Sequence, residues 1–378
     1  MLFRLTRRKD VPHAVLAVES GDGVFHYSGA AGAADDSGVP MQPDTPFFIA
    51  SIDKTYTACI VLKLCESKAI GLDQPVSSFL PNALIGGLHR LKGTDHTGAI
   101  TIRNLLSHTS GLPDWLEDRP KRGRSLIDWL MDGGDREMSL GDILEIVREH
   151  LVPHFPPQSG GAAHPKVRYS DTNFVLLAAV IEAVTSKPFG EVCEQMLLRP
   201  LQLRRTWMLG HGEPMERVLE PALLWAGGRP LRLPLMLKSI WSVYSTAEDA
   251  IRFLRALMQG AVFDNPETLS RMQRWNRFGF PLDYAALRSP NWPIQYGLGL
   301  MRFRVPRFGP RLHLIGHSGS TGCWLFHCPQ LDVYLAGSVD QATAGALPYR
   351  FLPKVLRALE RGNLRSSRGE GQGARMKI

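Results

Sequence analysis

The strand-like segments at both ends of the chain constrain the fold more than any other feature. Residues 13–18 and 24–27 are short apolar segments joined by Gly21-Asp22-Gly23, a combination typical of a β-hairpin. Four further segments of this kind follow one another near the C-terminus, at 296–303, 311–315, 322–328 and 333–339. The region between the two sets has the periodicity of helices and loops. We therefore expect an α/β (α+β) fold in which both chain ends build one sheet and helices are inserted between them.

The predicted elements divide the chain into two subdomains and a tail. We expect residues 1–75 and 240–362 to form a discontinuous α/β sheet subdomain that ends in a helix over 348–361. Residues 76–239 would form a mainly helical subdomain. Residues 363–378 are rich in Gly, Ser and Arg, a composition that predicts a disordered basic tail. A chain of 378 residues, 44% of them hydrophobic, is long and apolar enough to bury a large core or the cores of two subdomains.

The positive charge of the chain is confined to its ends. The net charge is +8, and it arises from four basic residues against one acidic in 1–10 and seven basic against two acidic in 354–378. The body between these ends is neutral, so it presents no basic face of the kind that nucleic-acid binding requires. Nucleic acid is therefore not an expected partner.

Several other classes of protein are excluded by missing signals. The five cysteines lack zinc-ligand spacing, which favours buried reduced thiols. Residues 11–18 are too short and too interrupted for a secretion signal, and no apolar run approaches a membrane span, so we expect a cytoplasmic protein. The chain has no phosphate-binding loop, no Gly-x-Ser-x-Gly and no His-Glu-x-x-His, so neither a metal nor an organic cofactor is expected.

A candidate nucleophile stands at the start of a predicted buried helix. The apolar run Phe47–Ala50 is followed by Ser51-Ile52-Asp53-Lys54 and then by an apolar helical segment, for which Gly71 is the expected end. Ser51 and Lys54 share one helix face, because side chains at i and i+3 are neighbours. The free N–H groups of a helix N-terminus suit a developing oxyanion. Ser51 is therefore a candidate nucleophile with an amine in reach.

Other local signals predict helix starts and a surface segment. Asp171 is placed to cap the helix after it, and two pairs resemble capping boxes, Ser139 with Asp142 and Ser245 with Glu248. Residues 113–138 mix charge, tryptophan and glycine, which indicates a surface segment or a lid.

Three clusters, taken together, resemble a known family. Ser51-Ile52-Asp53-Lys54, Tyr169-Ser170-Asp171 and His317-Ser318-Gly319 stand in the order and at the spacings of the serine β-lactamase and penicillin-binding-protein superfamily. The nearest branch is the class C-like serine hydrolases, which include esterases and D-amino-acid peptidases. The resemblance covers roughly residues 13–360 and implies a β-lactamase/transpeptidase-like fold with an antiparallel sheet. It also implies a serine hydrolase that forms an acyl-enzyme on a small ester or amide.

The resemblance assigns a role to each cluster. Ser51 would be acylated, and Lys54 would take or relay its proton. Tyr169 would be the second acid–base group. The backbone N–H groups of Ser51 and Ser320 would form the oxyanion hole. Substrate would be bound by a further set of residues, namely Asp171, His317, Ser318 and Gly319.

Two of these positions depart from the lactamase pattern. Asp171 stands where asparagine is usual, and His317 stands where lysine is usual. Histidine is a weaker partner for an anion than lysine, and Asp171 would repel an anion if it faced the cleft. Both changes favour neutral ester or amide substrates over β-lactams and peptide C-termini, which carry a carboxylate.

The sequence leaves several alternatives open. The base in acylation could be Lys54 or Tyr169, Asp171 could act only as a helix cap, and His317 could be purely structural. Within the class, a β-lactamase or a D-amino-acid peptidase is the alternative to an esterase. Outside it, the alternative is a catalytically silent binding protein. Substrate preference would depend on the segments 113–165 and 205–240.

Overall fold

The main sheet is assembled from both ends of the chain, as predicted. The computed structural model describes residues 1–277, 294–305 and 312–366, without the side chains of 362–366. Its eight antiparallel strands lie in the order β10 (Asn276–Arg277), β11 (Ile294–Tyr296), β12 (Met301–Arg304), β13 (His313–Ser318), β14 (Trp324–Cys328), β15 (Val333–Ser338), β1 (His13–Ser20) and β2 (His26–Gly32). The N-terminal β1 pairs with the C-terminal β15, Ala17 opposite Ala336. The predicted fold class is confirmed.

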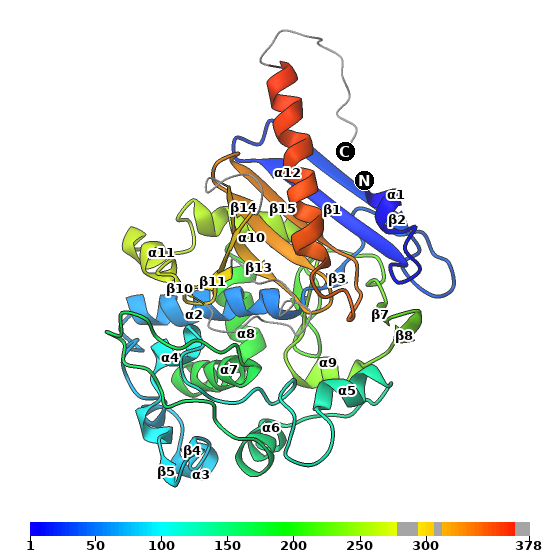
Figure 1. Cartoon of the computed structure of the whole chain (residues 1–378). Coiled ribbons are helices and arrows are strands. Elements are labelled where there is room, and N and C mark those ends of the chain that lie inside the picture. The colour runs from blue at the N-terminus through cyan, green and yellow to red at the C-terminus, as the bar shows by residue number, and fades with distance from the viewer. Residues whose placement is uncertain (278–293, 306–311, 367–378) are drawn as a thin grey trace.

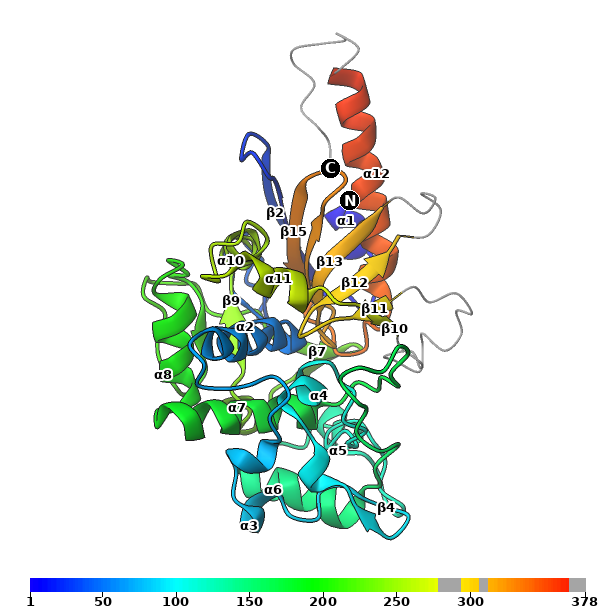
Figure 2. The same ribbon diagram turned by 90° about the vertical axis from the view of Figure 1, so that its left-hand side faces the viewer.

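The alternation of side chains along β1 separates two cores. Val15 and Ala17 belong to the larger core, whereas Leu16 and Val18 belong to a smaller one on the opposite face of the sheet. This is the expected result of a period of two residues in a strand buried on both faces. The smaller core is closed by α1 (Leu2–Leu5) and α12 (Leu347–Ser366), which lie on the same face of the sheet (Figure 2).

The larger core joins the sheet to the helical part of the chain. In Figure 2, α2 (Asp53–Glu66) lies between the sheet and α7 (Asp171–Thr185). The stretch from Lys54 to Leu62 is buried at every position, as the apolar sequence predicts. The helix therefore carries its N-terminal residues to the boundary between the two parts.

The remaining elements are short. The other helices are α3 (Asn82–Ile85), α4 (Ile102–Leu106), α5 (Leu126–Met131), α6 (Leu140–Glu145), α8 (Phe189–Cys193), α9 (Pro234–Ser239), α10 (Ala247–Met258) and α11 (Pro266–Met272). The other strands are β3 (Phe47–Phe48), β4 (Arg90–Leu91), β5 (Thr94–Asp95), β6 (Trp207–Met208), β7 (Leu224–Ala226), β8 (Arg229–Leu231) and β9 (Val243–Ser245). The division of the chain into a sheet unit and a mainly helical unit stays a prediction.

Several predicted boundaries are wrong by a few residues. The second strand begins at His26 and continues to Gly32, and the strand predicted over 296–303 is two strands, β11 and β12, with a turn between them. Helix α2 ends at Glu66 rather than near Gly71, because Lys68 adopts a positive φ of 62°. Helix α12 continues to Ser366, into the predicted tail. The rest of that tail, 367–378, and Arg311 of a predicted strand lie outside the described residues.

The capping boxes show why tertiary contacts shift such boundaries. Ser139 and Asp142 form the predicted box at α6. At α10, however, the cap is Thr246, one residue after the predicted Ser245. Ser245 is the last residue of β9, and its hydroxyl bonds to the Thr206 hydroxyl at 2.8 Å. Its side chain is therefore already used in the core.

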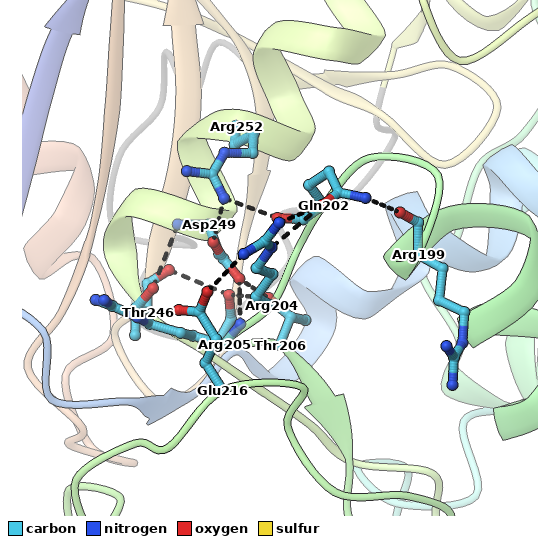
Figure 3. A network of polar contacts seen from close by, with 10 residues as sticks. Arg199, Gln202, Arg204, Arg205, Thr206, Glu216, Thr246, Asp249 and Arg252 are labelled. Carbon is cyan, nitrogen blue, oxygen red and sulfur yellow. Dashed lines mark hydrogen bonds and ion pairs between the residues drawn. The ribbon is translucent and has the colours of Figure 1, made fainter.

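Asp249 fastens the loop before β6 to the first turn of α10. Its carboxylate accepts hydrogen bonds from the Arg205 N–H at 2.7 Å and the Thr206 hydroxyl at 3.2 Å, and pairs with Arg252 at 3.0 Å. Figure 3 shows this network, in which Arg204 also reaches Glu216. Because the Asp249 side chain is only 4% exposed, these bonds are shielded from water.

We expect Asp249→Ala to lower the free energy of unfolding by about 2–3 kcal/mol, because it leaves buried donors without an acceptor. The adjacent Glu248→Ala, whose side chain is 41% exposed, should cost less than about 0.5 kcal/mol. Urea denaturation of both variants measures the difference. Equal losses would contradict a fastening role for Asp249.

Candidate active site

Ser51 lies on a tight turn between a strand and a helix. Strand β3 pairs with β9, and the Ile49 N–H continues the contact by donating to the Val243 carbonyl at 3.0 Å. Ala50 then adopts a positive φ of 44°, a conformation that L-residues rarely take. A short 3₁₀ turn over Ala50–Ile52 leads into α2. Such local strain clusters at functional sites, where the surrounding structure enforces it.

Lys54 contacts Ser51 as the motif predicts. Its Nζ donates a hydrogen bond to Ser51 Oγ at 3.1 Å. The same Nζ lies 2.5 Å from the Asp171 carboxylate and 3.9 Å from that of Asp53. Burial opposes the charge of Lys54, but Asp171 and Asp53 outweigh burial and raise its pKa above the ordinary value. Lys54 is therefore a cation at neutral pH, so it can relay the proton of Ser51 only if it passes one of its own protons on.

Asp171 does not cap α7. The helix has Ser170 as its N-cap residue and no side-chain capping bond, because the Asp171 carboxylate turns to Lys54. The start of the helix is held from outside instead. The Ser170 hydroxyl donates to the Pro113 carbonyl at 2.9 Å, and the Asp171 N–H donates to Asp114 Oδ2 at 2.8 Å.

Tyr169 lies beside the Ser51–Lys54 pair. Lys54 Nζ is 5.4 Å from the centre of its ring. Burial raises the pKa of the Tyr169 phenol well above 10, Asp171 adds to the rise, and the nearby Ser51 side chain lowers it. Among the described residues its buried hydroxyl has no regular hydrogen bond. Tyr169 is thus neutral and poised as a proton donor, rather than a tyrosinate.

His317 is not exposed to the cavity at Ser51. Its side chain is 1% exposed, and its ring nitrogens contact the Tyr296 hydroxyl at 3.1 Å and the Ser318 carbonyl at 2.8 Å. Burial, followed by the charge of Lys54, lowers the pKa of His317 to about 3. The ring is therefore neutral, and its position fits the structural alternative better than direct contact with a substrate anion.

The end of β13 lies over the Ser51 turn. A Cβ added at Gly319 would lie 2.7 Å from Ala50 Cβ and 3.1 Å from the Ile49 carbonyl oxygen. Only glycine permits so close an approach. Ser320, which follows, is exposed and lines the same cavity as Ser51. The predicted pairing of the Ser51 and Ser320 N–H groups in an oxyanion hole is consistent with this placement.

A large cavity brings the predicted residues together. Its volume is about 880 Å³. Its lining contains the predicted site residues Ser51, Lys54, Tyr169, Asp171, Ser318, Gly319 and Ser320, but not His317. The Ser318 hydroxyl faces Tyr349, with the two oxygens 2.5 Å apart. The structure therefore places three clusters that are distant in the sequence around one opening.

Two residues of the site escaped the sequence analysis. Asp114 is 3% exposed, and burial, reinforced by Asp171, raises its pKa to about 7. Tyr296 is fully buried against His317. Asp114 sits in the segment predicted only as a surface segment or lid, and neither residue carries a local motif. Burial and partners, which only the fold provides, are the signals that reveal them.

Within residues 1–277, 294–305 and 312–366, no three His, Cys, Asp or Glu side chains are grouped so that they could hold a metal ion. No helix in the same ranges is long and apolar enough to cross a membrane.

Comparison with known proteins agrees with this geometry. Residues 4–346 match the profile of the family described as Beta-lactamase. The chain is 28% identical over 323 residues to esterase EstB of Burkholderia gladioli, a match that covers 74% of each chain. It superposes on a D-stereospecific amidohydrolase from Streptomyces sp. with a TM-score of 0.68, at 26% identity and over 90% of this chain and 92% of that one. D-amino acid amidase from Ochrobactrum anthropi SV3 shares the fold, with a TM-score of 0.73, 21% identity and coverage of 96% and 97%.

We expect Gly319→Ala to lower kcat/KM for an ester about 10- to 100-fold, because the added methyl group pushes the end of β13 away from the Ser51 turn. Gly98→Ala is the control, since a Cβ there meets nothing within 4 Å. Ester hydrolysis and thermal unfolding are measured for both. Wild-type kcat/KM in Gly319→Ala would rule out the close approach as a requirement.

Asp171→Asn should shift the pH dependence of kcat/KM to lower pH. Asp171 raises the pKa of Lys54, so its removal lets burial dominate and lowers that pKa. We expect the limb of the profile that reports Lys54 to move by about one unit or more toward acid. Asp128→Asn, at an aspartate that lines the same cavity but pairs with Arg119, should leave that limb in place.

Proposed function

The chain belongs to the Beta-lactamase family, and from this premise we propose that it is a serine hydrolase that cleaves esters through an acyl-enzyme at Ser51. The observation that carries the proposal is the 3.1 Å contact between Ser51 Oγ and Lys54 Nζ, with Asp171 on the other side of Lys54. A hydroxyl, an ammonium and a carboxylate in a row at the wall of a large cavity form a nucleophile with a proton path.

In acylation, Ser51 Oγ attacks the carbonyl carbon of the ester. Its proton passes to Lys54 while Lys54 hands another to Asp171, so the positive charge stays beside the developing oxyanion. The N–H groups of Ser51 and Ser320 would stabilise that oxyanion. As the tetrahedral intermediate collapses, the neutral Tyr169 phenol protonates the leaving alcohol oxygen.

In deacylation, the same groups return their protons. The Tyr169 phenolate takes a proton from water, and the resulting hydroxide attacks the acyl carbon. Ser51 Oγ then leaves and is reprotonated by Lys54, which recovers its proton from Asp171. Every proton moved in acylation is restored, and the site is ready for a second substrate.

Paired charges in the cavity favour neutral substrates. Among the described residues that line it, the basic side chains are already matched with carboxylates: Lys54 with Asp171, Arg168 with Asp118 at 2.5 Å, and Arg119 with Asp128 at 3.3 Å. A substrate carboxylate would meet Asp171 without a vacant cation to offset it. The esterase among the relatives supports an ester as the bond that is cleaved.

Amide hydrolysis is the second candidate. The solved amidohydrolase at 26% identity supports it, and the same acyl-enzyme chemistry serves both bonds. An amide nitrogen is a poorer leaving group than an ester oxygen, so it depends more on the proton that Tyr169 donates.

We expect a fluorophosphonate probe to label the protein at Ser51, and Ser51→Ala to lose both labelling and hydrolysis of p-nitrophenyl acetate by at least about 10³-fold. Ser77→Ala, at an exposed serine, is the control and should behave as wild type. If wild type and Ser51→Ala behave alike, Ser51 is not the nucleophile. If neither probe nor penicillin forms an adduct with the folded protein, the silent binding protein replaces the hydrolase.

Hydrolysis of p-nitrophenyl acetate, a D-amino acid amide and a chromogenic cephalosporin separates the candidate substrate classes. We expect the ester to be turned over with the highest kcat/KM and the cephalosporin with the lowest, because only the latter carries a carboxylate. A higher kcat/KM for the cephalosporin would overturn the preference for neutral substrates.

A further inference from the structure

We infer that the substrate of this site carries a long aliphatic or large apolar group, of about eight carbons or more, on one side of its ester or amide bond. The inference rests on the proposed function, since it concerns the cavity that opens at Ser51. It adds to that function the class of substrate that the site selects.

The first observation is the size of the cavity compared with the size of a minimal substrate. About 880 Å³ lies near the upper end of the 300–1,000 Å³ that ligand pockets usually span. An acetyl group and a small alcohol would leave most of this space empty. A larger apolar group would fill more of the space and displace more water from its walls.

The second observation is the chemistry of the walls away from Ser51. Helix α5 contributes Leu130 and Met131, α7 contributes Val175, and α9 contributes Met236 and Leu237. Trp241, just after α9, also lines the space. Four of these side chains are less than 9% exposed, so each presents only a small apolar part of its surface to the cavity, whereas Met131 and Trp241 are half-buried and present more. Such walls bind hydrocarbon and offer no polar substrate a partner.

The third observation is how the charges are distributed. Lys54, Asp53, Asp171 and Tyr169 surround Ser51, while four other charged residues of the lining form two ion pairs, Arg168 with Asp118 and Arg119 with Asp128. The apolar walls on α5, α7 and α9 therefore hold no unmatched charge that a polar group could use. A substrate with one polar, hydrolysable bond and one long apolar arm matches both regions at once.

Chain-length dependence tests this substrate class. Two series are compared below their aggregation limits: p-nitrophenyl esters from acetate to dodecanoate, and acetate esters from methyl to decyl. We expect kcat/KM to rise about two- to fourfold per methylene, up to about eight carbons, in at least one series. Values that are flat or fall beyond four carbons in both series overturn the inference.

A matched pair of methionine variants tests the cavity itself. Met131→Gln keeps the shape of a half-buried side chain in the cavity wall but makes it polar. Met258→Gln makes the same change at a half-buried methionine at the end of α10, outside the lining. We expect the ratio of kcat/KM for octanoate to that for acetate to fall about fivefold or more in Met131→Gln only. An unchanged ratio in Met131→Gln, with thermal unfolding like wild type, overturns the assignment of the apolar wall.

The two levels of the proposal fail differently. If acetate is hydrolysed and Ser51 is labelled but chain length has no effect, the substrate class is wrong and the hydrolase stands. If no ester is cleaved and no adduct forms, the proposed function is wrong and the inference falls with it.

Discussion

The ion pair between Lys54 and Asp171 is the interaction on which the site depends. It joins the start of α2 to the start of α7, and so connects the sheet-bound serine to the helical part of the chain. It also fixes the charge of Lys54, because the carboxylate outweighs the cost of burying an ammonium. A site with asparagine at this position would leave the lysine to lose its proton more easily. Asp171 therefore influences the reaction at Ser51 indirectly, through the charge of Lys54.

The fold holds this pair by bringing both chain ends to the same turn. The N-terminal β3 and the later β9 support the strained Ala50, and the end of β13 closes over it at Gly319. Each contact involves backbone, so the position of Ser51 does not depend on flexible side chains. The cavity at Ser51 is also lined by α5, α7 and α9, which contribute mainly apolar side chains. A serine held in place by backbone contacts thus borders a cavity whose apolar walls match an apolar substrate group.

Much of this arrangement could be predicted from local patterns. The strands near both ends, the buried helix after Ser51 and the capping box at Ser139 follow from periodicity and from side-chain types at fixed spacing. Predictions failed where a side chain had a tertiary partner. Ser245 was expected to cap α10 but bonds to Thr206 instead, and Asp171 was expected as a possible cap but turns to Lys54. Local rules assume that a polar side chain serves its own segment.

The sequence by itself determined the fold class, the contact between Ser51 and Lys54, and the set of segments that meet at the site. These depend on spacing along one element or on a recognisable order of motifs. Only the tertiary structure decided that Lys54 is charged, that Tyr169 is neutral, that His317 is buried against Tyr296, and that the cavity is large and apolar. The reason is physical. A protonation state depends on desolvation and on charges at distances of a few ångströms, and a cavity depends on how separate elements pack.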